Sequence, residues 1–336
     1  MADVSDDAAA PWMDAQLGTL LAQKGHAWLL AGPSGLGQYS LALALARAWL
    51  CEEPSELGAC GRCTSCHAID VRAHADLCVL MPETSMLTLG WPLSEAAQSE
   101  IDDKKRKASK EVRIEAMRDA VEFSQRTSAR GRGKAILVFP AERMNVVSAN
   151  ALLKTLEEPA GDVRFVLASE AAYRLLPTIR SRCLVHTMVW PQPDAALAWL
   201  QAHGVDAGQA RVMLRAAGGR PQDALQFFRS EQDVQAWVRL PKAMAQGDPG
   251  VVQDWSASQT VDALQKLCHD MLAIGAGAEP RFFEASDLPA TASVAGLTTW
   301  AKALAASQRT AEHPFNAGLM LEALVSQAQN ALNSRH

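Results

Sequence analysis

A glycine-rich turn between two apolar stretches constrains the fold of this chain more than any other feature. The run HAWLLAG (26–32) is typical of a buried parallel strand, and SLALALARAWLC (40–51) contains strong helix formers without glycine or proline. The turn that joins them reads GPSGLGQYS (32–40). A strand, a glycine loop and a helix in this order predict the beginning of an α/β domain.

Two further apolar runs predict more strands of the same sheet, AILVF (135–139) and VRFVLA (163–168). The stretch between them, VSANALLKTLEE (147–158), has apolar residues at helical spacing and stops at Pro159. Strands that alternate with helices indicate a parallel sheet covered on both faces.

Strand signals fade after Pro191 and Pro193, and alanine-rich helical patterns follow to the C-terminus, which puts a boundary near residue 189. The stretch LPKAMAQGDPG, which begins at Leu240, supplies turn residues between helical segments. We therefore predict an α/β domain over 1–188, a small helical domain over 189–240 and a C-terminal helical domain over 241–336.

The net charge and the composition limit the cellular compartment of this protein and the kinds of partner that it can bind. The net charge is −5, so no global positive field draws the chain to nucleic acid or to a membrane. The acidic N-terminus lacks the pattern of a signal peptide, and no apolar run reaches the length of about 18 residues that a membrane span needs. Seven cysteines without an export signal indicate a reducing compartment. We expect a cytoplasmic protein with no membrane contact.

The glycine loop departs from the phosphate-binding pattern G-x-x-x-x-G-K-[ST] at two positions. Gly32, Gly35 and Gly37 allow backbone N–H groups to surround an anion, but Gln38 and Tyr39 stand where a lysine and a threonine or serine belong. Gln38 is neutral, and the Tyr39 hydroxyl is too far from the backbone to coordinate magnesium. The sequence predicts a degenerate loop without productive ATP binding; a tight turn with no ligand explains it equally well.

Four cysteines are spaced as C-x8-C-x2-C-x2-C: Cys51, Cys60, Cys63 and Cys66. Their thiolates can converge on one Zn²⁺ ion, and four sulfur ligands leave no position for water, so the metal would be structural. A disulfide pair or free buried cysteines are the alternatives, and His67 could replace one ligand. The other cysteines are isolated and are interpreted as core residues: Cys78, Cys183 and Cys268.

Two charged stretches predict solvated surfaces. Residues 94–113 carry both signs of charge at high density, which indicates a solvated insertion or the start of a helix, with a DNA-contacting loop as the alternative. Lys154 is spaced to pair with Glu157 and Glu158 within one helix.

Three stretches together resemble one known family. ANALLKTLEEP (149–159), VRFVLAS (163–169) and IRSRC (179–183) look like the clamp-loader branch of the AAA+ ATPases. The cysteine module (51–66) narrows the likeness to bacterial DNA polymerase III clamp loaders. The resemblance covers nearly all of the first domain and, more weakly, the remainder. It implies a P-loop (AAA+) α/β domain with a parallel sheet, a small helical lid domain and an all-α collar domain for oligomerisation.

Departures from the family pattern distinguish two kinds of subunit. Motor subunits of the gamma or tau type carry an aspartate and a glutamate where this chain has Phe139 and Pro140, and a sensor arginine where it has Gln222. Phosphoryl transfer depends on positioned charge, so the combined loss should abolish ATP hydrolysis. The resemblance therefore implies the non-motor kind of subunit.

The motif Ser181-Arg182-Cys183 is retained. In the family, the arginine of this motif points into the nucleotide site of the neighbouring subunit, where a guanidinium stabilises the transition state. The resemblance thus implies that Arg182 is an arginine finger in trans. A surface or ion-paired arginine is the alternative, and Arg180 is the nearby competitor.

The partners implied by the resemblance are gamma or tau motor subunits and a delta subunit in a hetero-pentamer, with the sliding clamp and primer–template DNA reached through the complex. Two alternatives remain open at this point. One is a divergent clamp-loader ATPase of the gamma or tau type; the other is a zinc-dependent nucleic-acid-binding module, which the net charge of −5 disfavours.

Overall fold

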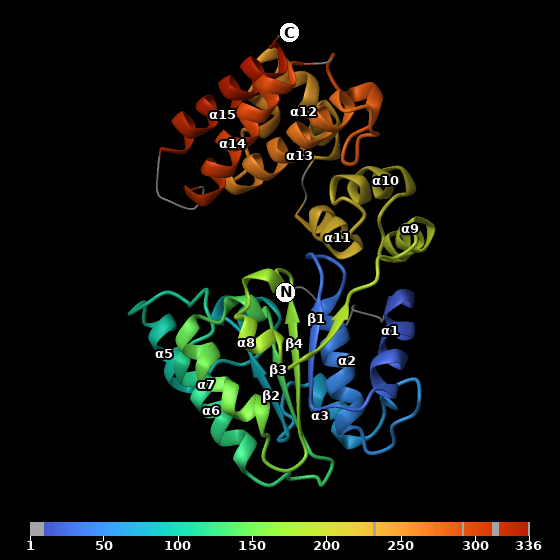
Figure 1. The fold of residues 1–336 in the computed structure, drawn as a ribbon, viewed down its shortest axis with the longest axis vertical. Coiled ribbons are helices and arrows are strands. Elements are labelled where there is room, and N and C mark those ends of the chain that lie inside the picture. The colour runs from blue at the N-terminus through green and yellow to red at the C-terminus, as the bar shows by residue number, and fades with distance from the viewer. Residues whose placement is uncertain (1–9, 231–232, 291, 311–315, 335–336) are drawn as a thin grey trace. The chain divides into compact units, whose positions relative to one another are not determined.

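A five-stranded sheet lies at the centre of the first part of the chain, with the strand order β2-β3-β4-β1-β5 and every pairing parallel (Figure 1). The strands are β1 (Ala27–Ala31), β2 (Leu77–Leu80), β3 (Lys134–Val138), β4 (Val163–Ser169) and β5 (Leu184–Thr187). The strands expected at 26–32, 135–139 and 163–168 are therefore confirmed as β1, β3 and β4. The short strands β2 and β5 were not expected.

The structure is a computed structural model that describes residues 10–230, 233–290, 292–310 and 316–334. The chain divides into two units, Met1–Pro191 and Gln192–His336. In its described residues the first unit is α/β, and the second contains only helices and connecting segments.

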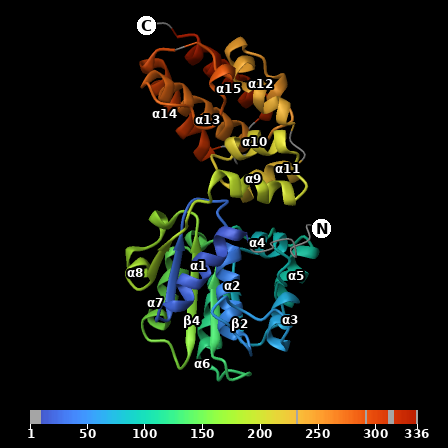
Figure 2. The same ribbon diagram turned by 90° about the vertical axis from the view of Figure 1, so that its right-hand side faces the viewer.

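Helices cover both faces of the sheet, as the alternating pattern predicts (Figure 2). Successive side chains of a strand point to opposite faces. Trp28 of β1 accordingly packs on Trp49 of α2 (Gln38–Leu50), with ring centroids 4.9 Å apart. The next residue, Leu29, is fully buried in a core that includes Leu152 of α7 (Val146–Glu157).

The two predicted helices form for local reasons. Helix α2 consists mostly of alanine, leucine and other helix formers, begins after the left-handed Gly37 and ends when Cys51 becomes extended. Helix α7 begins where the side chain of Asn145 accepts a hydrogen bond from the backbone N–H of Ser148 at 2.9 Å. It ends one residue before the segment Glu158-Pro159.

The remaining helices of the first unit flank these two. Helices α1 and α3 contact α2, whereas α6 and α8 contact α7. Their bounds, with the two short 3₁₀ turns, are α1 (Pro11–Ala22), α3 (Thr64–Asp70), α4 (Glu83–Thr88), α5 (Glu95–Asp102), α6 (Ile114–Gln125), η2 (Ala141–Arg143), η3 (Ala172–Arg174) and α8 (Pro177–Arg180).

The second unit contains helices along most of its described length. They are α9 (Pro193–Ala202), α10 (Ala207–Ala216), α11 (Pro221–Arg229), α12 (Val234–Gln246), α13 (Ala257–Gly275), α14 (Val294–Thr310) and α15 (Ala317–Leu332), with 3₁₀ turns η4 (Gly250–Val252) and η5 (Ala285–Asp287). Within the described residues, no helix combines the length and the apolar content that a bilayer crossing needs.

The turn expected in the stretch 240–250 comes near the end of that stretch. Helix α12 continues through Pro241 to Gln246, and the chain turns only at Gly247, which adopts φ 76°. Trp237 and Leu240 are buried in the same core as α13, α14 and α15. Packing of an amphipathic face therefore outweighs the local effect of Pro241.

Candidate functional site

The glycine loop follows the carboxyl end of β1 and leads directly into α2. Gly35 and Gly37 adopt φ 76° and 93°, in the left-handed region that glycine enters without a steric cost. Gly37 caps the N-terminus of α2 without a side chain, a backbone arrangement suited to an anion. The predicted backbone is present, so the neighbouring side chains determine what this loop can do.

Gln38 folds back onto the loop. Its side-chain amide donates hydrogen bonds to the carbonyl groups of Gly32 at 2.9 Å and Pro33 at 2.6 Å. The residue is only 2% exposed. Both N–H donors are therefore used inside the protein, and this position offers no cation to a terminal phosphate.

An aromatic cluster of Tyr39, Trp91 and Phe139 occupies the space beside the start of α2. The indole N–H of Trp91 donates a hydrogen bond to the Tyr39 hydroxyl at 2.6 Å. The rings of Tyr39 and Phe139 have centroids 5.4 Å apart, and the guanidinium of Arg72 lies 4.6 Å from the Trp91 ring centroid. Tyr39 and Trp91 are each 7% exposed, so the hydroxyl is engaged in packing and not directed at a metal position.

The positions of the family's acidic pair hold no carboxylate. Phe139 and Pro140 directly follow β3. The first carboxylate after them, Glu142, accepts hydrogen bonds from the Ser169 hydroxyl at 2.7 Å and from the Glu170 backbone N–H at 3.2 Å. Glu142 therefore ties η2 to the end of β4.

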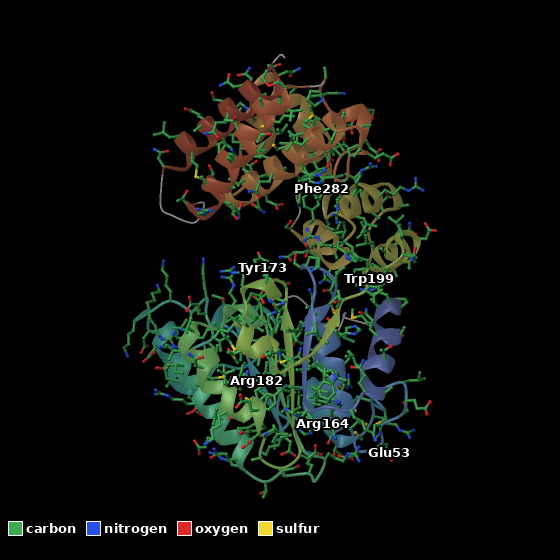
Figure 3. The ribbon with its side chains drawn as sticks, viewed as in Figure 1. Glu53, Arg164, Tyr173, Arg182, Trp199 and Phe282 are labelled. Atoms are coloured by element: carbon green, nitrogen blue, oxygen red, sulfur yellow. The ribbon has the colours of Figure 1, made fainter. Side chains whose placement is uncertain are left out.

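Arg182 lies just after α8 and is held by α7 and α8 (Figure 3). Its Nε and Nη2 groups both donate to one carboxylate oxygen of Glu157, and its Nη1 donates to the carbonyl of Thr178 at 2.8 Å. The side chain of Arg182 remains 32% exposed. Within the single chain, Arg182 is therefore an ion-paired arginine, as the alternative interpretation expected. Its guanidinium is still accessible to solvent.

The other residues of this motif have different environments. Ser181 is exposed, and its hydroxyl accepts a further hydrogen bond from Arg182 Nη1 at 3.3 Å. Cys183 packs against the sheet core, and burial raises the pKa of its thiol to about 12. Arg180 is exposed at the end of α8.

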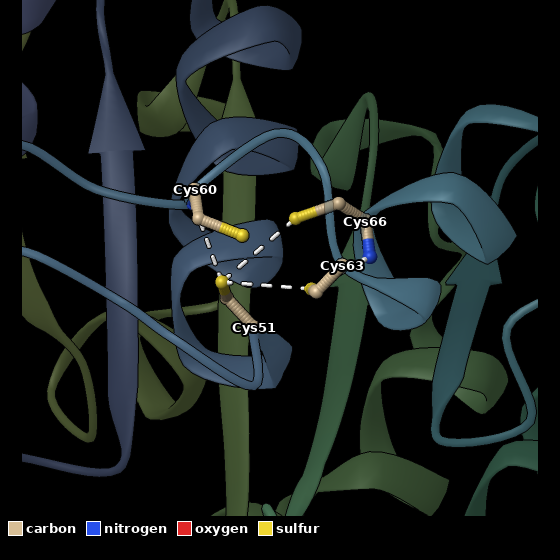
Figure 4. A group of neighbouring side chains, drawn as sticks. All are labelled: Cys51, Cys60, Cys63 and Cys66. Atoms are coloured by element: carbon tan, nitrogen blue, oxygen red, sulfur yellow. Dashed lines mark hydrogen bonds between the residues drawn. The ribbon is translucent and has the colours of Figure 1, made fainter.

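The four predicted zinc ligands converge on one point (Figure 4). The sulfur atoms of Cys51, Cys60, Cys63 and Cys66 all lie within 4.8 Å of one another, and Cys51 Sγ is 3.8 Å from both Cys63 Sγ and Cys66 Sγ. Sulfur atoms arranged tetrahedrally at about 2.3 Å from one zinc ion are about 3.8 Å apart. The thiols therefore already have the spacing of a zinc site, and the exposed His67 is not part of the group.

The cysteine group is linked to the rest of the domain through Glu52. Its carboxylate accepts hydrogen bonds from the Thr64 hydroxyl at 2.6 Å, from the Ser65 backbone N–H at 3.2 Å and from Arg130 Nη1 at 3.1 Å. Arg130 belongs to the loop before β3. These contacts fix the cysteine module to the loop before β3.

All cysteines in the described residues are free thiols. Burial works against ionisation of Cys63, but hydrogen bonds from the backbone at Glu52 and Cys66 outweigh it and lower the pKa of Cys63 to about 6. Burial is the main cause that raises the pKa of Cys66 to about 12. Burial also raises the pKa of the isolated Cys78 to about 12. Metal binding would therefore draw protons from the more buried thiols of the group.

The charged stretch 94–113 is structured, and several of its polar groups form ion pairs or hydrogen bonds with nearby residues. It contains α5, and Arg106 pairs with Glu83 at 2.5 Å and with Glu100 at 2.6 Å. The backbone N–H of Ser109 also donates to Glu83 at 2.8 Å. These contacts favour a solvated, ion-paired segment over a loop dedicated to DNA.

Comparison with known proteins places the chain in a family. Residues 18–190 match a family model described as DNA polymerase III, delta subunit. The DNA polymerase III subunit delta' of Pseudomonas aeruginosa is 34% identical over 287 residues, which are 79% of this chain and 80% of the relative. The same subunit of Escherichia coli is 32% identical over 251 residues, or 73% and 67% of the two chains. The chain belongs to the delta' family of DNA polymerase III subunits.

Subunits named tau match this chain over a smaller part of their own length. The tau subunit of Escherichia coli is 35% identical over 159 residues, which are 47% of this chain and 21% of tau. The solved structure of a gamma subunit-related protein of Thermotoga maritima has a TM-score of 0.51 and 16% identity, covering 96% of this chain and all of that one. The α/β fold with a parallel sheet and the assignment to the delta' family are therefore confirmed.

Sequence reasoning missed two partners in this delta' chain. Glu157 pairs with Arg182 and not with Lys154, because α8 brings the later residue back to the end of α7. Trp91 lies 52 residues from Tyr39, and no local pattern connects them. The only sequence feature that could have pointed to Trp91 was its isolated position after a glycine, in Gly90-Trp91.

Proposed function

We propose that this delta' chain is a subunit of a bacterial clamp loader that hydrolyses no ATP itself and helps place the sliding clamp on primed DNA. The hydrogen bond between Tyr39 and Trp91, packed against Phe139, carries this proposal. Catalysis of phosphoryl transfer requires positioned charges at the terminal phosphate. Neutral side chains fill the corresponding region of this chain, so any nucleotide held by the glycine loop would not be turned over.

Arg182 is the group that the chain contributes to ATP chemistry, as an arginine finger in the nucleotide site of a neighbouring motor subunit. Its partial exposure, its place in the IRSRC motif and its orientation by Glu157 and Thr178 support this role. A guanidinium binds phosphate oxygens bidentately, so exchange of the Glu157 carboxylate for a phosphate preserves its hydrogen bonding. Ser181 and Cys183 hold the turn that carries it.

The cysteine group would hold one structural Zn²⁺ ion through the four thiolates of the module 51–66. Such an ion supplies no catalysis, because a closed site of four sulfur ligands has no free position. The spacing of the sulfur atoms and the contacts of Glu52 support a role in fixing this module to the domain.

The assembly proposed for the chain is a cytoplasmic hetero-pentamer with gamma or tau motor subunits and delta. The first unit would be the AAA+ domain, α9–α11 the lid and the helices from α12 onward the collar through which the subunits associate. The shared core of α12, α13, α14 and α15 supports the packing of these helices as one collar.

Two measurements test this function. The purified chain is assayed for ATP turnover alone and with DNA and clamp, and we expect none above background; stimulated turnover would favour the divergent gamma or tau ATPase. The chain is then added to motor and delta subunits, and we expect clamp loading to depend on it. Tight DNA binding by the chain alone at about 150 mM salt would instead favour a zinc-dependent nucleic-acid-binding module.

A further inference from the structure

A second candidate site lies at the opposite end of the sheet from the glycine loop. A groove of about 1170 Å³, here called the amino-end groove, is lined by the end of α1, the start of β1, the end of α2 and the loop 54–57. Arg132, which precedes β3, and Arg164, in β4, complete its lining. Figure 3 shows Arg164 at the same end of the first unit as Glu53 of the cysteine module.

The charge of the amino-end groove contrasts with that of the whole chain. Lys24, Arg132 and Arg164 line it together with a single acid, Glu56, although the net charge of the protein is −5. In the described part of the chain, Lys24 and Arg132 have no ionic or hydrogen-bonding partner, and Arg164 pairs with Asp162 at 3.3 Å. Unpaired cations around one concave surface favour a ligand with several negative charges.

The floor of the amino-end groove is aromatic and apolar. Trp28 and Trp49 form it, the guanidinium of Arg164 lies 5.8 Å from the Trp49 ring centroid, and the indole N–H of Trp28 has no acceptor among the described residues. At the rim, Leu57 is 88% exposed. An apolar side chain of a ligand can therefore pack against Leu57 at the rim.

We propose that the amino-end groove binds an extended acidic peptide segment of a partner protein, and that the cysteine module shapes one wall of this site through the loop 54–57. The volume exceeds the range of about 300–1,000 Å³ that is usual for small-molecule pockets, which favours a chain segment. A single nucleic acid strand fits less well, because Trp28 and Trp49 are 2% and 8% exposed and offer no free ring face for stacking bases.

A peptide selection on the full-length chain tests this site. The immobilised protein is used to select from a random-peptide phage library, and a fluorescein-labelled copy of the enriched peptide is then titrated by anisotropy. We expect enrichment of sequences that combine aspartate or glutamate with leucine or phenylalanine. The double substitution Lys24→Glu and Arg132→Glu should weaken binding at least about tenfold, because it reverses two cations of the groove.

The matched control reverses two exposed cations of α14, Lys302→Glu and Arg309→Glu, and should change the affinity by less than about twofold. Leu57→Ser should weaken binding without unfolding the chain, as checked by circular dichroism. The proposal is overturned if no peptide is enriched, if the enriched peptides lack acidic residues or if both double reversals weaken binding equally. Displacement of the peptide by oligothymidylate would assign the groove to nucleic acid and overturn it as well.

Discussion

Glu157, the last residue of α7, forms an ion pair with Arg182, and the carbonyl of Thr178 accepts a further hydrogen bond from the same guanidinium. The two side chains are 44% and 32% exposed, so the pair contributes at most about 1 kcal/mol to folding. Arg182 is therefore oriented by contacts that cost little to exchange, which fits the role proposed for it at a neighbouring site.

Arg182→Ala should leave the fold intact and remove most of the ATP turnover at the adjoining site. Arginine fingers supply a factor of about 10³–10⁵ in rate. The measurement uses a reconstituted complex in which only the motor subunit next to this chain has a working nucleotide site. Arg180→Ala is the matched control and should retain turnover. Equal turnover in the Arg182→Ala complex would contradict the finger.

Restoring the two missing loop residues should not create an ATPase. In the double variant Gln38→Lys and Tyr39→Thr, the position after β3 still lacks a carboxylate to hold magnesium or polarise water, since it reads Phe139-Pro140. We expect turnover at background level in a phosphate-release assay. Sustained hydrolysis by this variant would show that the aromatic residue after β3 is not limiting.

The hydrogen bond between Tyr39 and Trp91 should contribute measurably to the free energy of unfolding. Tyr39→Phe keeps the ring but leaves the buried indole N–H of Trp91 without its acceptor, which costs about 1–3 kcal/mol. Urea denaturation gives this value, and Trp91→Phe in the Tyr39→Phe background should cost less than in the wild type. Additive losses in this double-mutant cycle would show that the two side chains do not interact.

Zinc analysis should find one ion per chain, held by the cysteine group. Replacing Cys60 and Cys63 with serine removes two of four thiolate ligands and should abolish binding. Cys78→Ala is the control and should retain the ion, since Cys78 lies in β2 outside the group. Elemental analysis by plasma mass spectrometry decides the point. Full zinc content in the double serine variant would rule out this ligand set.

Asp76 should make folding stability depend on acid pH. Burial acts to raise its pKa, but hydrogen bonds from the backbone N–H groups of Ala129 and Arg130 and from the Ser128 hydroxyl outweigh it, and the pKa is lowered. A carboxyl group with a lowered pKa in the folded state stabilises the protein above its unfolded pKa of about 4, and this contribution is lost as the pH falls through the folded-state pKa.

The corresponding substitution is Asp76→Asn, which should cost about 1–3 kcal/mol at pH 7 because an amide accepts fewer hydrogen bonds than a carboxylate. The difference in unfolding free energy between wild type and variant should shrink as the pH falls below about 4. Urea titrations at several pH values measure it. A difference that stays constant over this range would show that the Asp76 charge does not contribute.

Local patterns predicted the strands and helices whose signal is strong within a few residues. β1, β3 and β4 are continuous apolar runs, and α7 has both a helical period and a proline after its end. The edge strand β5 was not recognised because its residues are mostly exposed and it lacks that apolar run. It exists because its backbone pairs with β1. The turn expected in 240–250 comes only at Gly247, because burial of Trp237 and Leu240 sustains a helix through Pro241.

The residues of the candidate site could be predicted from local patterns, but their partners could not. The cysteine spacing and the Ser181-Arg182-Cys183 motif are visible along the chain. The partners of these residues come from distant segments, as Trp91 does for Tyr39 and Arg130 does for Glu52. Only the tertiary fold brings them together, so no single-segment pattern could identify them.

The aromatic cluster has a consequence for how such a chain can evolve. Each of Tyr39, Trp91 and Phe139 packs against another member, so a change of one to a small polar residue opens a hole in the protein before any catalytic group is complete. A single substitution in this cluster therefore costs stability at once, and the three positions resist change one residue at a time.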